Sequence, residues 1–138
     1  MQNLSINLWA LLGAASFKFF LGGLWYSPLL FAKKWAKLTG VTPQNAKYPP
    51  AVAMGMEFAV TLVMAFVLAH MAHYAGAHTW QTGLQTGLWV WLGFVATTTL
   101  GPLFFEGTSF SLWLINNGYH ALGLMGMGTI LAVWGGVS

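Results

Sequence analysis

The sequence predicts an all-α integral membrane protein in which four transmembrane helices form a bundle and a short interfacial amphipathic helix follows the first span. Composition is the first reason: apolar residues make up 57% of the 138-residue chain, charged residues make up 5%, and the mean hydropathy is +0.67. A soluble domain carries about a quarter charged residues, so this chain has too few charges to cover a surface that faces water. The second reason is four apolar stretches, each long enough for a helix that crosses the bilayer.

The four predicted spans form a single domain over residues 1–138. They are residues 4–26, 51–73, 82–104 and 109–135. Each reaches the roughly 20 residues that a helix needs to cross the hydrocarbon core. Ser27-Pro28 closes the first span and Pro49-Pro50 opens the second, because proline fits a first helical turn but not a helix interior. No positive segment or small-residue cleavage site precedes the first span, so we expect this span to remain in the mature protein.

The basic residues are concentrated in one connection. All five are lysines, and four of them lie between the first and second spans: Lys33, Lys34, Lys37 and Lys47. The positive-inside rule places this connection in the cytoplasm and both termini outside, in a bacterial inner membrane. Because the charge bias is explained by topology, we expect no nucleic-acid partner.

Residues 28–38, PLLFAKKWAKL, are too short and too charged to span the membrane. As a helix they place Phe31, Trp35 and Leu38 on one stripe, with the lysines roughly opposite. This pattern predicts a helix in the headgroup region with its lysines toward anionic membrane lipids. The residues predicted at the membrane interface are Trp25, Tyr26, Lys33, Lys34, Trp35 and Lys37.

The stretch GGLWYSPLLFAKKW, residues 22–35, resembles a bacterial family of small integral membrane proteins, the domain-of-unknown-function family 1761 (DUF1761). The resemblance continues through WLGF at residues 91–94, Glu106, and INNGYH at residues 115–120. Within the first stretch it rests on Gly22, Trp25, Tyr26, Ser27, Pro28, Phe31, Lys33 or Lys34, and Trp35. It implies a four-span membrane protein. Because the family has no assigned function, the resemblance implies no catalytic residues.

Polar side chains from all four spans fall in one layer of the predicted membrane. Lys18 lies roughly 12 Å and Glu57 roughly 9 Å from the cytoplasmic ends of their spans. An ionisable residue inside a membrane usually faces a partner or a water-filled cavity, so we expect Lys18 and Glu57 to pair. Amides and hydroxyls at the same level would complete the hydrogen bonds. The candidate ligand-binding or proton-linked residues are Lys18, Glu57, Thr98, Asn116, Asn117 and His120.

This polar layer has two interpretations. As a pocket, it predicts a binding or transport protein for a small molecule or for protons. As a lock, it predicts a structural or accessory membrane subunit without chemistry of its own, since interhelical hydrogen bonds hold helices together. The sequence has no nucleotide loop and no paired carboxylates, because Glu57 and Glu106 are the only acids. An enzyme is therefore the less favoured class, and no cofactor is indicated.

A third interpretation concerns His70, His73 and His78, which lie at the outer end of the second span and in the loop beyond it. Imidazole binds zinc and copper, and His70 and His73 share a helical face. The chain has no cysteine, and no acid lies nearby to complete the set of ligands. The sequence thus leaves open an outer-face metal site, but favours histidines that contact lipid headgroups.

Glycines provide the predicted contact surfaces. Gly83 and Gly87 form a small-xxx-small pair on the third span. The fourth span carries Gly118, Gly123, Gly126 and Gly128. Such positions permit close helix packing, either inside the bundle or in a homo-oligomer or a complex with a partner membrane protein. The sequence does not separate these uses.

Overall fold

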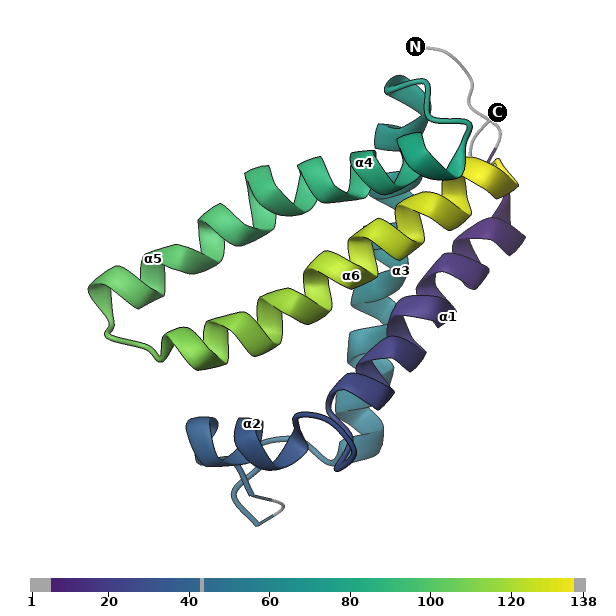
Figure 1. Ribbon diagram of the computed structural model, residues 1–138. Helices are drawn as coiled ribbons and strands as arrows, with labels where there is room; N and C mark the ends of the chain where they lie inside the picture. The colour runs from purple at the N-terminus through teal and green to yellow at the C-terminus, as the bar shows by residue number, and fades with distance from the viewer. Residues whose placement is uncertain (1–5, 43, 136–138) are drawn as a thin grey trace.

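The computed structural model describes residues 6–42 and 44–135, and it is all-helical (Figure 1). The helices are α1 (Leu8–Trp25), α2 (Ala32–Thr39), α3 (Pro50–Tyr74), α4 (Trp80–Val90), the π-helical segment η1 (Trp91–Ala96), α5 (Thr97–Phe105) and α6 (Phe110–Trp134). Because α4, η1 and α5 follow one another without a break, they form one continuous helix of 26 residues.

Each predicted span overlaps one of these long helices, and most of the predicted ends lie within two residues of the observed ones. The exception is α1, which begins at Leu8 rather than at residue 4. Asn7 caps this helix: its Oδ1 accepts hydrogen bonds from the backbone nitrogens of Trp9 (3.1 Å) and Ala10 (3.3 Å). Residues 4 and 5 of the predicted span lie outside the described residues.

Within the described residues, three helices are long and apolar enough to cross a membrane. They are α1, α3 and the continuous α4–η1–α5 helix, with mean hydropathies of 1.4, 2.1 and 1.5. This composition agrees with an integral membrane protein. α6 has 25 residues but is not one of the three, because Asn116, Asn117 and His120 lower its mean hydropathy. The fourth predicted span is thus a helix of sufficient length, whose passage through the membrane stays a prediction.

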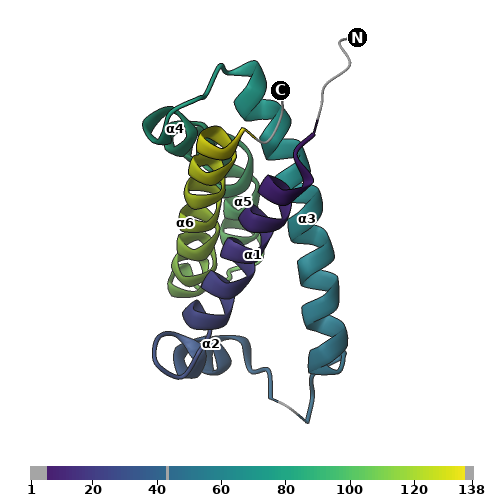
Figure 2. The same cartoon turned by 90° about the vertical axis from the view of Figure 1, so that its right-hand side faces the viewer.

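The other helices pack around α6. It lies beside α1 and runs antiparallel to the α4–η1–α5 helix, while α3 packs against both α1 and α6 (Figures 1 and 2). The core joins Leu124, Met127 and Leu131 of α6 to small side chains on α1 and α3. These small residues are Ala10, Ala14, Ala15, Ala65 and Ala69, each at most 2% exposed. Because its neighbours cover much of α6, this helix can carry polar residues that do not face lipid.

Glycines bring α4 and α6 into backbone contact. A Cβ added at Gly87 would collide with the carbonyl of Leu124, and one added at Gly83 would collide with the carbonyl of Gly128. Two more glycines of α6 face α1: Gly126 contacts the ring of Phe17, and Gly118 faces Trp25. The glycines that the sequence left open between bundle and oligomer are therefore used inside the chain.

α2 lies across the end of the molecule where α1 finishes and α6 begins (Figure 2). It begins at Ala32 rather than at residue 28, because residues 28–31 form a turn in which the backbone nitrogen of Phe31 donates to the carbonyl of Trp25 at 3.1 Å. The amphipathic pattern is as predicted. Lys33, Lys34 and Lys37 are exposed, whereas Phe31, Trp35 and Leu38 are half-buried.

The contact between α4 and α6 can be tested with one glycine and a matched control. Gly87→Ala should lower stability by about 1–3 kcal/mol, because the added methyl group forces the two backbones apart. The measurement is thermal unfolding in detergent. Gly55→Ala on α3 is the control, since nothing lies within 4 Å of a Cβ at Gly55. Equal stability of the two variants would contradict the close contact.

Candidate functional site

Lys18 lies buried between α1 and α6. Its side chain is 0% exposed, and its Nζ has no hydrogen-bond partner. The Nζ atom lies 4.0 Å from the centroid of the Tyr119 ring. The aliphatic part of the side chain lies along α6 at Gly123, where a Cβ would come within 2.9 Å of Lys18 Cγ and Cε. Gly123 therefore provides the space in which the lysine side chain lies.

His120 adds a second nitrogen without a partner. Its Nδ1 is buried and makes no hydrogen bond. The neighbouring Tyr119 links these groups: its hydroxyl donates to the backbone carbonyl of Lys18 at 3.1 Å, and its ring centroid lies 5.1 Å from that of His120. We call Lys18, Tyr119 and His120 the Lys18 site.

The predicted pair between Lys18 and Glu57 is not formed. Glu57 is exposed on α3, and Lys18 Nζ has no hydrogen-bond partner. Instead Thr61, one turn along α3, is 0% exposed and turns inward. The reason is that Gly123 and the Tyr119 ring hold the lysine against α6. Glu57 nevertheless lies near this part of α1, because Phe58 next to it and Phe19 next to Lys18 have ring centroids 5.5 Å apart.

Asn117 belongs to a separate network between α5 and α6. It is 2% exposed. Its Oδ1 accepts from Thr99 Oγ1 at 3.1 Å, and its Nδ2 donates to the carbonyl of Trp113 at 3.2 Å. Trp113 Nε1 donates to Thr99 Oγ1 at 3.0 Å, which closes the network. The predicted Thr98 is not part of it, because its side chain is exposed and its hydroxyl donates to the carbonyl of Phe94 within its own helix.

Asn116 meets the aromatic pair at the end of α1. Tyr26 donates its hydroxyl proton to Asn116 Oδ1 at 2.7 Å, and Trp25 Nε1 donates to the carbonyl of Ile115 at 2.8 Å. Both aromatic side chains are half-buried, so they join two helices and are not simply residues of the membrane interface. The two stretches that carry the family resemblance, residues 22–35 and 115–120, are thus in direct contact.

Sequence reasoning did not find this contact. It placed Trp25 and Tyr26 in the aromatic belt and Asn116 in the pocket. One signal was available: buried indole N–H and phenol O–H groups need acceptors. Asn116 supplies such an acceptor on the facing helix.

The three histidines of the predicted metal site are not gathered around one point. Within the described ranges, no group of three His, Cys, Asp or Glu side chains could hold a metal ion. His70 Nδ1 donates to the carbonyl of Phe66 at 2.8 Å, and His78 is exposed in the loop. His73 Nδ1 is buried without a partner. The histidines therefore offer no set of ligands for zinc or copper.

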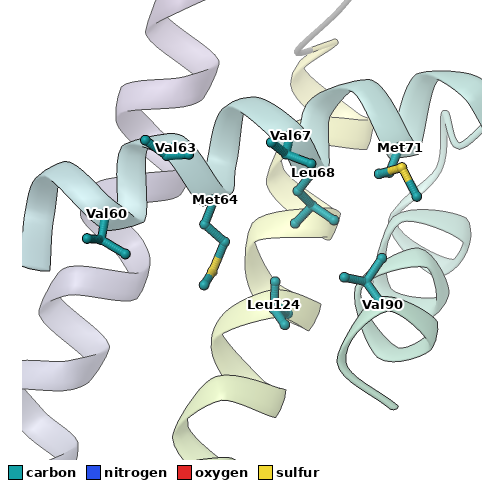
Figure 3. A pocket seen from close by; sticks show the side chains of 8 residues that line it. All are labelled: Val60, Val63, Met64, Val67, Leu68, Met71, Val90 and Leu124. Atoms are coloured by element: carbon teal, nitrogen blue, oxygen red, sulfur yellow. The ribbon is translucent and has the colours of Figure 1, made fainter. Parts of the chain in front are cut away.

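An apolar pocket of about 300 Å³ opens between α3, α4 and α6 (Figure 3). Its lining consists of Val60, Val63, Met64, Val67, Leu68, Met71, Val90 and Leu124. Figure 3 shows the side chains of α3 along one wall, with Leu124 and Val90 on the other side. None of the predicted polar residues takes part. Because this pocket has no group that could orient a polar ligand, the candidate functional site is the Lys18 site.

The contact between Tyr26 and Asn116 can be tested by removing one hydroxyl. Tyr26→Phe should lower stability by about 1–2 kcal/mol, because it leaves the partly buried Asn116 oxygen without its donor. Thermal unfolding in detergent measures the effect. Tyr74→Phe, on a side chain that is 70% exposed, is the control. A loss no larger than that of the control would show that the hydrogen bond does not hold α1 to α6.

Comparison with known proteins identifies the family. No curated protein and no solved structure matches the chain. A family model described as "Protein of unknown function (DUF1761)" matches residues 9–132, which include both contacting stretches. The chain therefore belongs to the DUF1761 family, as its resemblance in residues 22–35 and 115–120 predicted.

Proposed function

We propose that this protein is a four-span membrane protein that binds or transports a small ligand in a proton-linked manner. The Lys18 site is its ionisable centre. One observation carries the proposal: a lysine that is 0% exposed and has no hydrogen-bond partner lies near the same tyrosine ring as a histidine whose buried Nδ1 also has none. Ionisable residues inside membranes usually belong to ion or substrate pathways.

The energetics support this interpretation. A lysine near the middle of a membrane helix costs about 3 kcal/mol even on the insertion scale that penalises it least. The contact with the Tyr119 ring returns about 2 kcal/mol when it is dry. A charge that serves only as a structural lock would need a partner in the folded protein, and Lys18 has neither an ion pair nor a hydrogen bond. Its place in the bundle is better explained by a ligand or a proton that it binds during function.

The membrane arrangement is part of the proposal. α6 would form the fourth span, because it is as long as α3 and is covered by α1, α3 and α4. The lysines around α2 would face the cytoplasm and anionic lipid, and both termini would lie outside. The positive-inside rule and the exposed lysines on α2 support this orientation.

A structural or accessory subunit is the second candidate, and a different set of contacts favours it. Asn117, Thr99 and Trp113 satisfy one another, as do Tyr26 and Asn116. These groups behave as interhelical locks. Since the glycines that face a neighbouring helix are used inside the chain, a homo-oligomer or a complex with a partner would use other surfaces. Native mass spectrometry of the gently extracted protein would show either assembly.

Lys18→Met tests the two candidates against each other. The variant should keep its fold and gain about 1–4 kcal/mol of stability, because an apolar side chain of similar length replaces an unpaired buried charge. If the Lys18 site is proton-linked, proton entry into proteoliposomes under a pH gradient should fall to the level of protein-free vesicles. An enclosed pH-sensitive dye reports this entry. Lys34→Met, on the exposed face of α2, should behave as wild type. Equal entry through wild type and Lys18→Met would favour the structural subunit.

The orientation can be mapped by cysteine labelling, because the chain has no cysteine of its own. Single variants Lys47→Cys, His78→Cys and Thr108→Cys place one thiol in each connection between the long helices. In intact cells, a membrane-impermeant maleimide should label only His78→Cys. The other two should react after permeabilisation. Labelling of Thr108→Cys in intact cells would contradict the proposed orientation.

A further inference from the structure

We propose that the Lys18 site binds a small monovalent anion, a halide or a short carboxylate, held between Lys18 Nζ and His120 Nδ1. This inference rests on the proposed function and names the class of its ligand. The two nitrogens come from two packed helices, and both are buried without a partner. Both side chains lie near the Tyr119 ring: Lys18 Nζ is 4.0 Å from its centroid, and the His120 ring centroid is 5.1 Å away. Lys18 offers three N–H donors and no acceptor, and His120 Nδ1 is a donor in one neutral tautomer and in the charged form.

None of the neighbouring acceptors described above bonds to these two nitrogens. The Tyr119 hydroxyl donates its proton to the backbone carbonyl of Lys18. The side-chain oxygens of Asn116 and Asn117 already accept from Tyr26 and Thr99. A bound water would satisfy the hydrogen bonds but leave the charge uncompensated in an apolar surrounding. An anion supplies both the acceptors and the opposite charge.

The position of the lysine fixes where the anion would lie. Gly123 holds the aliphatic part of Lys18 against α6, and the Tyr119 ring lies 4.0 Å from Nζ. The Tyr119 ring also lies 5.1 Å from the His120 ring, so the anion would lie close to this tyrosine. Since the lysine is completely buried, the site suits an ion of a few atoms. The class is that of chloride, bromide, formate or acetate.

The negative charge of Glu57 predicts the direction in which anion affinity changes when that charge is removed. Glu57 is exposed and does not bond to Lys18. It lies near the site, because the next residues along each helix, Phe58 and Phe19, have ring centroids 5.5 Å apart. A bound anion is repelled by this charge, so removing the charge strengthens anion binding. A site that binds a cation would respond in the opposite direction.

The experiment measures anion binding to the full-length protein in lipid nanodiscs. Chloride binding is followed by the line width of ³⁵Cl NMR, and ¹³C-formate binding by saturation transfer, so the two arms distinguish a halide from a carboxylate. Lys18→Met should weaken binding by about 30-fold or more, because one partner of a buried charge pair is lost. Glu57→Gln should strengthen it several-fold, a gain that misfolding cannot produce. The exposed Lys34→Met is the control and should bind as wild type does.

The outcomes separate this inference from the proposed function. If neither anion binds to wild type while proton entry still depends on Lys18, the anion inference is wrong and the proposed function stands. If neither anion binds and proton entry is also independent of Lys18, both are wrong. Binding that Lys34→Met weakens as much as Lys18→Met would place the anion on the surface of α2 and overturn the inference, and so would weaker binding in Glu57→Gln.

Discussion

The burial of one ammonium group among packed helices is the constraint on which the rest of this structure depends. Lys18 is completely covered and has no hydrogen-bond partner. Its side chain fits because α6 has a glycine at position 123, and its Nζ lies 4.0 Å from the centroid of the Tyr119 ring. The same segment of α6 must therefore lack bulk at one position and carry an aromatic ring one turn away. With Asn116, Asn117 and His120 on the same helix, α6 is more polar than an ordinary lipid-facing span.

The two stretches that define the family resemblance hold this arrangement in place. Trp25 and Tyr26 end α1 with hydrogen bonds to Ile115 and Asn116, two turns of helix from Lys18. These bonds fix the register of α1 on α6, and the register decides which residues of α6 face the lysine. On the other side of α6, the contact at Gly83 and Gly87 and the network of Thr99, Trp113 and Asn117 hold the α4–η1–α5 helix. The polar groups that have hydrogen-bond partners thus position Lys18 and His120, whose buried nitrogens have none.

Local features of the helices could be predicted from the sequence, whereas the contacts between helices could not. Helix positions were predictable because apolar length and proline punctuation are local properties, and the amphipathic α2 followed from its lysine pattern. The partner of Lys18 was not predictable, because charge complementarity suggested Glu57 while the rotation of α3 turns Thr61 inward instead. Spacing placed Thr98 at the right level but did not identify its neighbour Thr99 as the threonine that faces Asn117. The π-helical turns of η1, which change the rotation of the helix just before these threonines, leave no clear trace in the composition.

The most direct test is solid-state NMR on the protein in lipid bilayers with ¹⁵N-labelled lysine side chains, with the Lys18 signal assigned by its loss in Lys18→Met. The other four lysines, Lys33, Lys34, Lys37 and Lys47, are exposed and serve as internal references. The account predicts that the Nζ protons of Lys18 exchange with water much more slowly than those of the other four and that they show a through-space contact to the ring of Tyr119. Exchange as fast as in the other lysines, or a contact to the Glu57 carboxylate in place of Tyr119, would contradict it.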